Sequence, residues 1–76
     1  MKEIKQFFEH IGRSDINETT DNLIEDGIID SIEIMNLIQE IETHYGFLID
    51  FDYITPENFK NFQSIDAMIK NIEENK

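Results

Sequence analysis

Apolar residues recur along the chain with the spacing of amphipathic helices. The first group occupies positions i, i+3, i+4 and i+7 and consists of Ile4, Phe7, Phe8 and Ile11. The second group consists of Ile34, Leu37, Ile38, Ile41 and Tyr45. The third group consists of Ile65, Met68, Ile69 and Ile72. Because each group falls on one face of a helix, the pattern predicts three amphipathic helices around a core of Ile and Phe, the first ending at Gly12.

Residues with capping chemistry mark the start and the end of the second helix. Asp30 is followed three residues later by Glu33. This is the spacing of a capping box, with Asp in place of Ser or Thr. The helix is therefore expected to begin at Asp30–Ser31 and to run to about Tyr45, with Gly46 as its stop.

Another helix signal lies between the second and third apolar groups. Thr55 precedes Pro56, a pair that favours Thr as N-cap and Pro as the first helical residue. The signal predicts a short helix of one or two turns that ends at Phe59. Ser64 is expected to cap the last helix. Together these elements predict an all-α fold, a small four-helix bundle whose third helix is short.

Residues 13–29 are expected to form a long first loop. They are rich in Ser, Asp, Asn and Thr, and their apolar members are Ile16, Leu23, Ile24, Ile28 and Ile29. Loops longer than ~12–15 residues in a compact domain are usually functional or disordered. The chain has no internal repeat, low-complexity tract or Pro/Gly/Ser-rich linker. We therefore expect residues 1–76 to form a single domain.

The chain is strongly acidic, and its charges are unevenly distributed. It contains 17 acidic and 6 basic residues, which give a formal net charge of −11. Residues 14–59 contain twelve Asp and Glu but no Lys or Arg. This distribution disfavours binding to a nucleic-acid backbone or an anionic membrane and favours basic protein partners. An acidic surface that only keeps the protein in solution is the alternative interpretation.

Several classes of protein are excluded by what the sequence lacks. Without cysteine the chain has no disulfide scaffold, thiol nucleophile or thiolate metal site. No apolar run approaches the ~20 residues of a membrane-spanning helix. The first residues lead into no signal-peptide core. We therefore expect a soluble, cytoplasmic and monomeric protein.

The sequence offers little catalytic chemistry. His10 and His44 are the only histidines, and both are expected on helix surfaces. Ser31 and His44 lie thirteen residues apart on one helix, about 20 Å along its axis, which is too far for a nucleophile–base pair. Neither Asp21 nor Asp50 begins a calcium-binding loop. We expect no catalytic residue, no metal ligand and no independent enzyme.

Ser31 is the residue whose position points to a function. A serine in the first turn of a helix projects outward, where another protein can reach it. A phosphate group attached there would lie near free backbone N–H groups and the positive end of the helix dipole. The alternative is an acidic helical interaction module without a cofactor, in which Ser31 is an ordinary helix-start residue.

Residues 27–34, with the sequence GIIDSIEI, resemble the acyl carrier protein family. The family's motif is Asp-Ser followed by Leu or a similar residue at the head of the second helix, here Asp30-Ser31-Ile32. The resemblance covers nearly the whole chain, because its length, acidity, lack of cysteine, long first loop and short third helix agree as well. It implies a four-helix bundle of acyl-carrier type.

The resemblance implies that Ser31 receives 4′-phosphopantetheine from coenzyme A through a phosphopantetheinyl transferase, with Asp30 assisting the transferase complex. The thiol of this group then carries an acyl group as a thioester between enzymes. The helix face implied to contact partners contains Glu33, Met35, Asn36, Glu40 and Glu42. The implied partners are the transferase, a loading ligase, and downstream transferases or synthases with basic docking surfaces. From periodicity alone, Met35 is equally expected at the edge of the core.

Differences from the fatty-acid-synthesis pattern affect the expected cargo. Gly27 lies four residues before Ser31 instead of three, Ile32 replaces the usual Leu, and Asn36 stands where an acid is common. In these respects the chain is more similar to stand-alone carriers of specialised pathways, including D-alanyl carrier proteins. The implied cargo is an acyl intermediate, as in fatty acid or polyketide biosynthesis, or an amino acid loaded by an adenylating enzyme.

Overall fold

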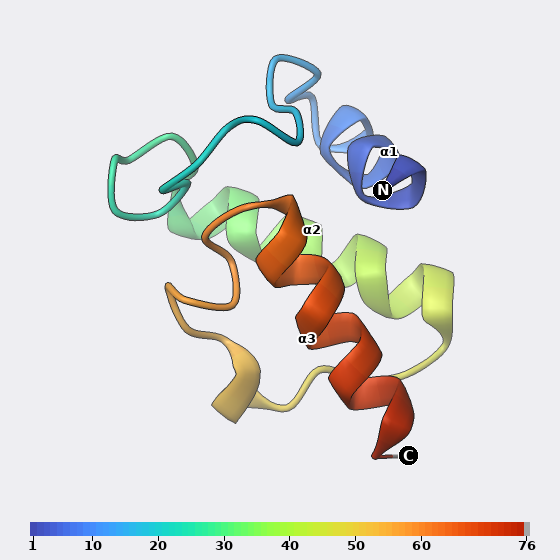
Figure 1. The fold of residues 1–76 in the computed structure, drawn as a ribbon. Coiled ribbons are helices and arrows are strands. Elements are labelled where there is room, and N and C mark those ends of the chain that lie inside the picture. The colour runs from blue at the N-terminus through green and yellow to red at the C-terminus, as the bar shows by residue number, and fades with distance from the viewer. Residues whose placement is uncertain (76) are drawn as a thin grey trace.

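The computed structural model describes residues 1–75 and contains three α-helices and one 3₁₀ turn in that range (Figure 1). The helices are α1 (Lys2–His10), α2 (Ser31–Tyr45) and α3 (Phe62–Glu74), and the 3₁₀ turn η1 spans Phe51–Tyr53. The described residues form no strand, so the predicted all-α class is confirmed. The predicted four-helix bundle is not confirmed, because the described residues form three helices and the segment expected to form the short third helix does not form one.

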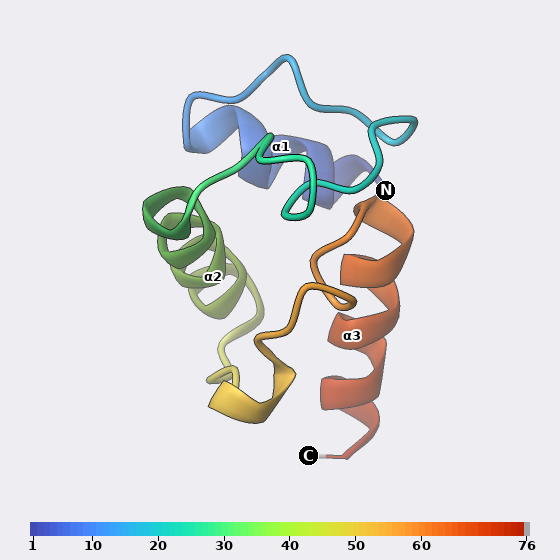
Figure 2. The same cartoon turned by 90° about the vertical axis from the view of Figure 1, so that its left-hand side faces the viewer.

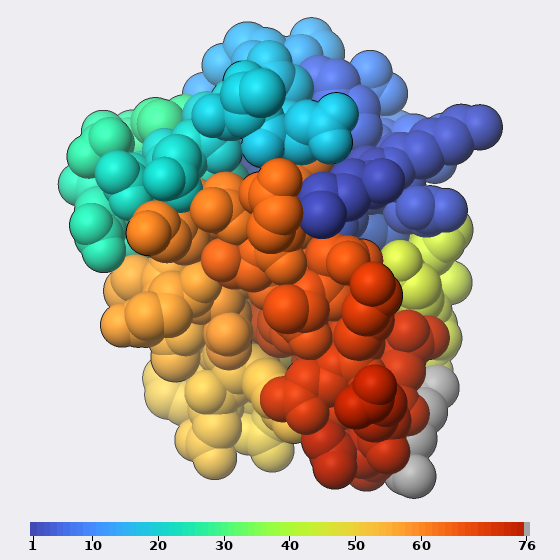
Figure 3. Space-filling model, in the orientation of Figure 1, coloured from blue at the N-terminus to red at the C-terminus, as the bar shows by residue number. Residues whose placement is uncertain are grey.

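The three helices are arranged around α1. α1 contacts both α2 and α3, and Figure 2 shows it lying across one end of the other two. The chain from residue 47 to residue 61 runs alongside α2 and α3 in this view. The long loop of residues 13–30 covers the surface beside the first turns of α1 and α3 (Figure 3). The Cα radius of gyration of 11.3 Å matches the ~11 Å expected for a compact chain of this length.

All buried side chains described are apolar, and they form one cluster. The helices contribute Ile4, Phe7, Phe8, Leu37, Ile38, Ile41, Phe62, Ile65, Met68, Ile69 and Ile72. The connecting segments contribute Ile16, Leu23, Ile29, Phe47, Ile49 and Phe59. The predicted helix stripes therefore do face the core, and the long loop is held down by three of its predicted apolar anchors.

The end of α1 has the hydrogen bonds of a Schellman motif. Gly12 adopts a φ of 82°, a left-handed conformation that glycine takes without a steric penalty. The Gly12 N–H donates to the Glu9 carbonyl at 3.0 Å, and the Arg13 N–H donates to the Phe8 carbonyl at 2.8 Å. Gly12 therefore ends the helix as predicted, and it turns Arg13 back toward the body of the protein.

α2 begins and ends where the sequence predicts. Asp30 is its N-cap in extended conformation, and the capping box with Glu33 is complete. Gly46 is the C-cap with a φ of 72°, and its N–H donates to the Glu42 carbonyl at 2.9 Å. Both signals are local, which is why the sequence was sufficient to place this helix.

The helix predicted after Thr55 is limited to a single turn. The Asn58 N–H donates to the Thr55 hydroxyl at 3.2 Å, and the Phe59 N–H donates to the Thr55 carbonyl at 3.3 Å. The helix does not continue because Asn61, two residues after Phe59, is extended (φ −159°) as the N-cap of α3. Thr55 therefore does act as a cap, but only of a single turn, and the Lys60 carbonyl after it accepts the Leu23 N–H from the long loop at 3.0 Å.

The last helix begins earlier than predicted. Its N-cap is Asn61, whose side chain accepts the Ser64 N–H at 2.8 Å. The prediction that Ser64 caps the helix is therefore wrong. The physical reason is Phe62, which is 1% exposed and extends the apolar stripe of α3 by one position toward the N-terminus.

Candidate functional site

The candidate site is the first turn of α2, where the long loop ends. Ser31 is the first helical residue, and its side chain is exposed. Its hydroxyl makes no hydrogen bond within residues 1–75. The backbone N–H groups of Ser31 and Ile32 have no acceptor inside the helix, since the first N–H groups of any helix lack one. The hydroxyl is therefore open to a second protein, beside two free donors.

The capping box between Asp30 and Glu33 fixes the turn that contains Ser31. Asp30 Oδ1 accepts the Glu33 N–H at 2.8 Å, and Glu33 Oε1 accepts the Asp30 N–H at 3.1 Å. Reciprocal bonds of this kind fix the entry of the chain into the helix. The second oxygen of the Asp30 carboxylate accepts no hydrogen bond within the described residues, and Asp30 is exposed, so this oxygen is an unused acceptor on the residue before Ser31.

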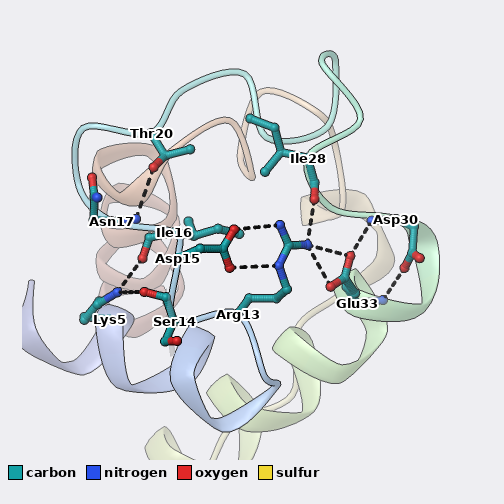
Figure 4. Close-up of polar contacts among 10 residues, drawn as sticks. All are labelled: Lys5, Arg13, Ser14, Asp15, Ile16, Asn17, Thr20, Ile28, Asp30 and Glu33. Carbon is teal, nitrogen blue, oxygen red and sulfur yellow. Dashed lines mark hydrogen bonds and ion pairs between the residues drawn. The ribbon is translucent and has the colours of Figure 1, made fainter.

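Arg13 links the end of α1 to the start of α2. Its Nη1 donates to the Ile28 carbonyl at 2.7 Å and to Glu33 Oε2 at 2.8 Å (Figure 4). Glu33 therefore belongs both to the capping box and to an ion pair with Arg13. Because the side chains of Arg13 and Glu33 are each only 23% exposed, this pair is less screened by water than a surface pair.

The other edge of the Arg13 guanidinium holds Asp15. Nε and Nη2 donate to the two Asp15 carboxylate oxygens, each at 3.1 Å, which is the two-pronged geometry that arginine favours with carboxylates. The hydrogen bonds from Arg13 hold the pKa of Asp15 below its ordinary value. The hydrogen bonds to Asp15 and, with a smaller effect, those to Glu33 raise the pKa of Arg13. Arg13 is therefore a permanent cation surrounded by two carboxylates and a carbonyl.

The beginning of the long loop is fixed in a similar way. Lys5 Nζ donates to the Ser14 carbonyl at 2.5 Å and to the Ile16 carbonyl at 2.7 Å. Figure 4 shows Lys5 and Arg13 reaching the loop from the α1 side. The loop is therefore tied to the helices at both of its ends despite its length.

The sequence did not single out Arg13 as part of this site. One signal could have indicated it: a glycine that ends a helix turns the following residue back toward the protein, and here that residue is a base at the edge of the acidic segment. The pairing of Arg13 with Glu33 was harder to predict, because Glu33 lies 20 residues away in the chain. The sequence analysis also did not include Ile32 among the residues expected to contact partners, although its side chain is 72% exposed.

The residues expected to contact partners fall into two groups. The three acidic ones each hold an intramolecular contact: Glu33 with Arg13, Glu40 with His10, and Glu42 with the Ile49 N–H. Met35 and Asn36 are exposed, and Met35 is 62% exposed. The exposed residues of α2 therefore include Ile32, Met35 and Asn36 along with Ser31, Gln39 and Thr43. Met35 is a surface residue instead of an edge-of-core residue.

The two histidines lie on helix surfaces, as predicted. His10 Nδ1 lies 2.7 Å from Glu40 Oε1 and ties the end of α1 to the middle of α2. His44 packs edge-on against Phe7, with a ring-centroid distance of 5.2 Å. His44 is in the last turn of α2, and Ser31 is in the first. The structure therefore brings neither histidine into a pair with Ser31.

A hollow of about 410 Å³ lies elsewhere on the molecule. It is lined by Met1, Lys2, Lys5, Asn17, Glu18 and Phe62. None of these residues belongs to α2, and Lys5 already donates to two loop carbonyls. We therefore do not include this hollow in the candidate site.

Comparison of the chain with known protein families, with curated proteins and with solved structures finds no match. None of the helices in residues 1–75 has the length and hydropathy that crossing a lipid bilayer requires. Within the same residues, no three His, Asp or Glu side chains are grouped as a metal site would need.

The acidic surface predicts a response of stability to salt. The described residues form three Lys or Arg ion pairs and one His10–Glu40 contact. Most of the 17 acidic side chains therefore have no Lys or Arg partner in the described residues and repel one another. Raising NaCl from about 10 mM to about 300 mM is expected to raise the Tm by roughly 5 °C. Scanning calorimetry at matched ionic strengths of NaCl and MgCl₂ measures the effect.

The comparison of the two salts separates screening from specific binding. Because no described group of carboxylates has the arrangement of a metal site, the two salts are expected to act alike. A Tm that does not change with NaCl would show that the carboxylates are too far apart for their repulsion to lower the stability. A larger rise with Mg²⁺ than with Na⁺ at equal ionic strength would contradict the screening explanation.

Proposed function

We propose that this protein is a discrete cytoplasmic carrier that receives 4′-phosphopantetheine on Ser31 and moves an acyl group between enzymes. The observation that carries the proposal is an exposed serine hydroxyl at the first position of a helix whose start is firmly held. The Asp30–Glu33 capping box and the Arg13 contact both act on this one turn. A transferase needs this combination, because it must find the hydroxyl in a defined position.

The residues around Ser31 fit a phosphodiester group. The hydroxyl is exposed, and the N–H groups of Ser31 and Ile32 are free to donate to phosphate oxygens, at the end of α2 where the helix dipole favours negative charge. When bound, the group supplies a flexible arm whose thiol can carry an acyl group as a thioester. A protein without cysteine would obtain its reactive sulfur in this way. The free oxygen of Asp30 lies beside the serine and is available to the transferase complex.

Partner enzymes would contact the outward face of α2. Ile32, Met35 and Asn36 form its exposed part next to Ser31. The acids Glu40 and Glu42 surround this part on the same helix, although each also holds an intramolecular contact. An apolar centre with an acidic rim suits enzymes that have basic docking surfaces.

The decisive experiment is intact mass spectrometry after incubation with coenzyme A and a phosphopantetheinyl transferase of broad specificity. We expect a gain of one phosphopantetheine group in the wild-type protein and none in Ser31→Ala. Ser14→Ala is the matched control. Like Ser31, Ser14 is an exposed serine, and the residue after each of the two serines is exposed as well. It is expected to be modified like the wild type.

Two results would overturn the carrier proposal. One is the absence of any mass gain in the wild-type protein while an authentic carrier is modified in the same tube. The other is an undiminished gain in Ser31→Ala. Either result would favour the interaction module without cofactor. The modified protein is then incubated with D-alanine or with a fatty acid, each together with an activating ligase. The mass gained by the protein shows whether it carries an aminoacyl or an acyl group.

A further inference from the structure

Two large apolar side chains beyond the end of α2 are left almost fully in water. Leu48 is 83% exposed and Phe51 is 81% exposed, the highest values among the large exposed apolar residues described. They lie three residues apart: Leu48 is in the segment that leads into η1, and Phe51 is the first residue of η1. In Figures 1 and 2, η1 lies toward the end of the molecule where α3 ends, whereas the first turn of α2 lies toward α1. This surface is therefore separate from the Ser31 site.

The fold itself does not require apolar residues at these two positions. Phe47 and Ile49, on either side of Leu48, are buried to 8% and 7% exposure, so the chain alternates and Leu48 points outward. Asp50 then caps η1 by accepting the Asp52 N–H at 3.0 Å. No residue of η1 is buried, so this turn leaves Phe51 in solvent. Polar residues at positions 48 and 51 would satisfy the same backbone.

The charged residues adjacent to Leu48 and Phe51 in the chain are both acidic. Asp50 and Asp52 are both exposed and form no ion pair within residues 1–75. They belong to the stretch of residues 14–59 that contains no Lys or Arg. Four of the five large exposed apolar residues described, including Leu48 and Phe51, lie within this same stretch. Exposed apolar surface therefore coincides with uncompensated negative charge.

We propose that Leu48, Asp50, Phe51 and Asp52 form a docking surface for a basic partner, which we call the η1 surface. The partner it fits has apolar side chains flanked by Lys or Arg, as on the face of a basic amphipathic helix. A second copy of this chain is a poor occupant, because it would place the same aspartates against each other in a protein of formal net charge −11. The η1 surface does not involve Ser31 and does not depend on its modification.

A synthetic helical peptide of ~18 residues composed of Leu and Lys provides the probe. It is titrated into the ¹⁵N-labelled protein, and amide shifts give the site and the Kd. We expect the largest shifts at residues 47–53. Leu48→Ser/Phe51→Ser is expected to weaken binding at least about fivefold, because a buried aromatic anchor dominates small interfaces. The matched control Ile32→Ser/Met35→Ser removes the exposed apolar pair of α2 and is expected to weaken binding less than about twofold.

The contribution of charge is tested separately. Asp50→Asn/Asp52→Asn keeps the capping geometry, since Asn is as good an N-cap as Asp, and is expected to weaken binding and to reduce its dependence on salt. All variants change exposed residues, and their thermal unfolding is compared with that of the wild type. Repeating the titration with Ser31→Ala is expected to give the same Kd.

Three outcomes would overturn the proposal. The first is equal weakening by the two apolar double variants, or shifts confined to residues 31–39. The second is binding that neither salt nor the aspartate variant alters. The third is dimerisation of the protein alone, seen by sedimentation and abolished by Leu48→Ser/Phe51→Ser, which would identify a second copy as the occupant.

Discussion

Replacing Phe8 with alanine is expected to lower the free energy of unfolding by about 3–5 kcal/mol. Phe8 is fully buried, and its ring stacks on that of Phe62 with a centroid distance of 5.1 Å. The substitution removes this contact and leaves a cavity where α1 meets α3. A chain of 76 residues has a total stability of only about 4–11 kcal/mol. The variant is therefore expected to lose a large part of its stability, as measured by urea unfolding at 25 °C.

The control for this prediction is the same substitution at an exposed position. Phe51→Ala removes an identical ring, but this ring is 81% exposed, so the free energy of unfolding is expected to change by less than about 0.5 kcal/mol. Similar losses in the two variants would mean that the stacking of α1 on α3 is not what stabilises the fold. Phe8→Leu, which keeps most of the volume, is expected to fall between them.

The parts of the fold that could be predicted are those that depend on neighbours in the sequence. α2 was located from its capping pair and its terminal glycine, because both act within one turn of the helix they limit. The helix stripes were found from their period, and Phe8 and its neighbours do lie in the core. These signals need no knowledge of the remaining chain.

The parts that failed depend on contacts between distant residues. The turn after Thr55 has the chemistry of a helix start, yet it remains a single turn, and the Lys60 carbonyl that follows it accepts the Leu23 N–H of the distant loop. α3 begins at Phe62 instead of after Ser64 because the core takes up that ring. The Lys60 bond and the space that the core leaves for Phe62 depend on distant residues, whereas the Asn61 cap is a local signal that the prediction missed.

The candidate site shows the same division. Ser31 and Asp30 were placed correctly, because the position of a residue in the first turn follows from its cap. The capping-box role of Glu33 was also predicted, but its ion pair with Arg13 was not. In the structure it is bound by Arg13 across 20 residues. The acids of α2 therefore contribute to holding the fold as well as to the negative surface, while the apolar Ile32 and Met35 are left exposed.

Replacing Arg13 with glutamine is expected to loosen the loop in front of Ser31. The change removes the bonds to Ile28, Glu33 and Asp15 and leaves Glu33 without its cation. We expect a loss of about 2 kcal/mol in the free energy of unfolding and amide exchange at residues 28–33 at least about tenfold faster. Under the proposed carrier function, transfer of phosphopantetheine to Ser31 should also slow, because the hydroxyl is held less firmly.

Two control variants separate the contact from the charge. Lys70→Gln removes the same charge from an exposed pair with Asp66 at 3.0 Å, and is expected to cost less than about 0.5 kcal/mol. Arg13→Lys keeps the charge but cannot make the two-pronged contact, and is expected to recover only part of the loss. Equal effects of Arg13→Gln and Lys70→Gln would show that net charge alone, and not the link between α1 and α2, explains the result.

The pH dependence of the Arg13 effect has a definite sign. Arg13 holds the pKa of Asp15 below its ordinary value, so this pair stabilises the folded state above the ordinary pKa of an aspartate, about 3.9. That stabilisation is lost as the pH falls through the lowered pKa, because protonation then removes the acceptor charge. The difference in unfolding free energy between the wild type and Arg13→Gln is therefore expected to be largest near neutral pH and to shrink by about pH 2.5. A difference that stays constant over this range would mean that Arg13 acts through its carbonyl contact with Ile28 instead of through the carboxylates.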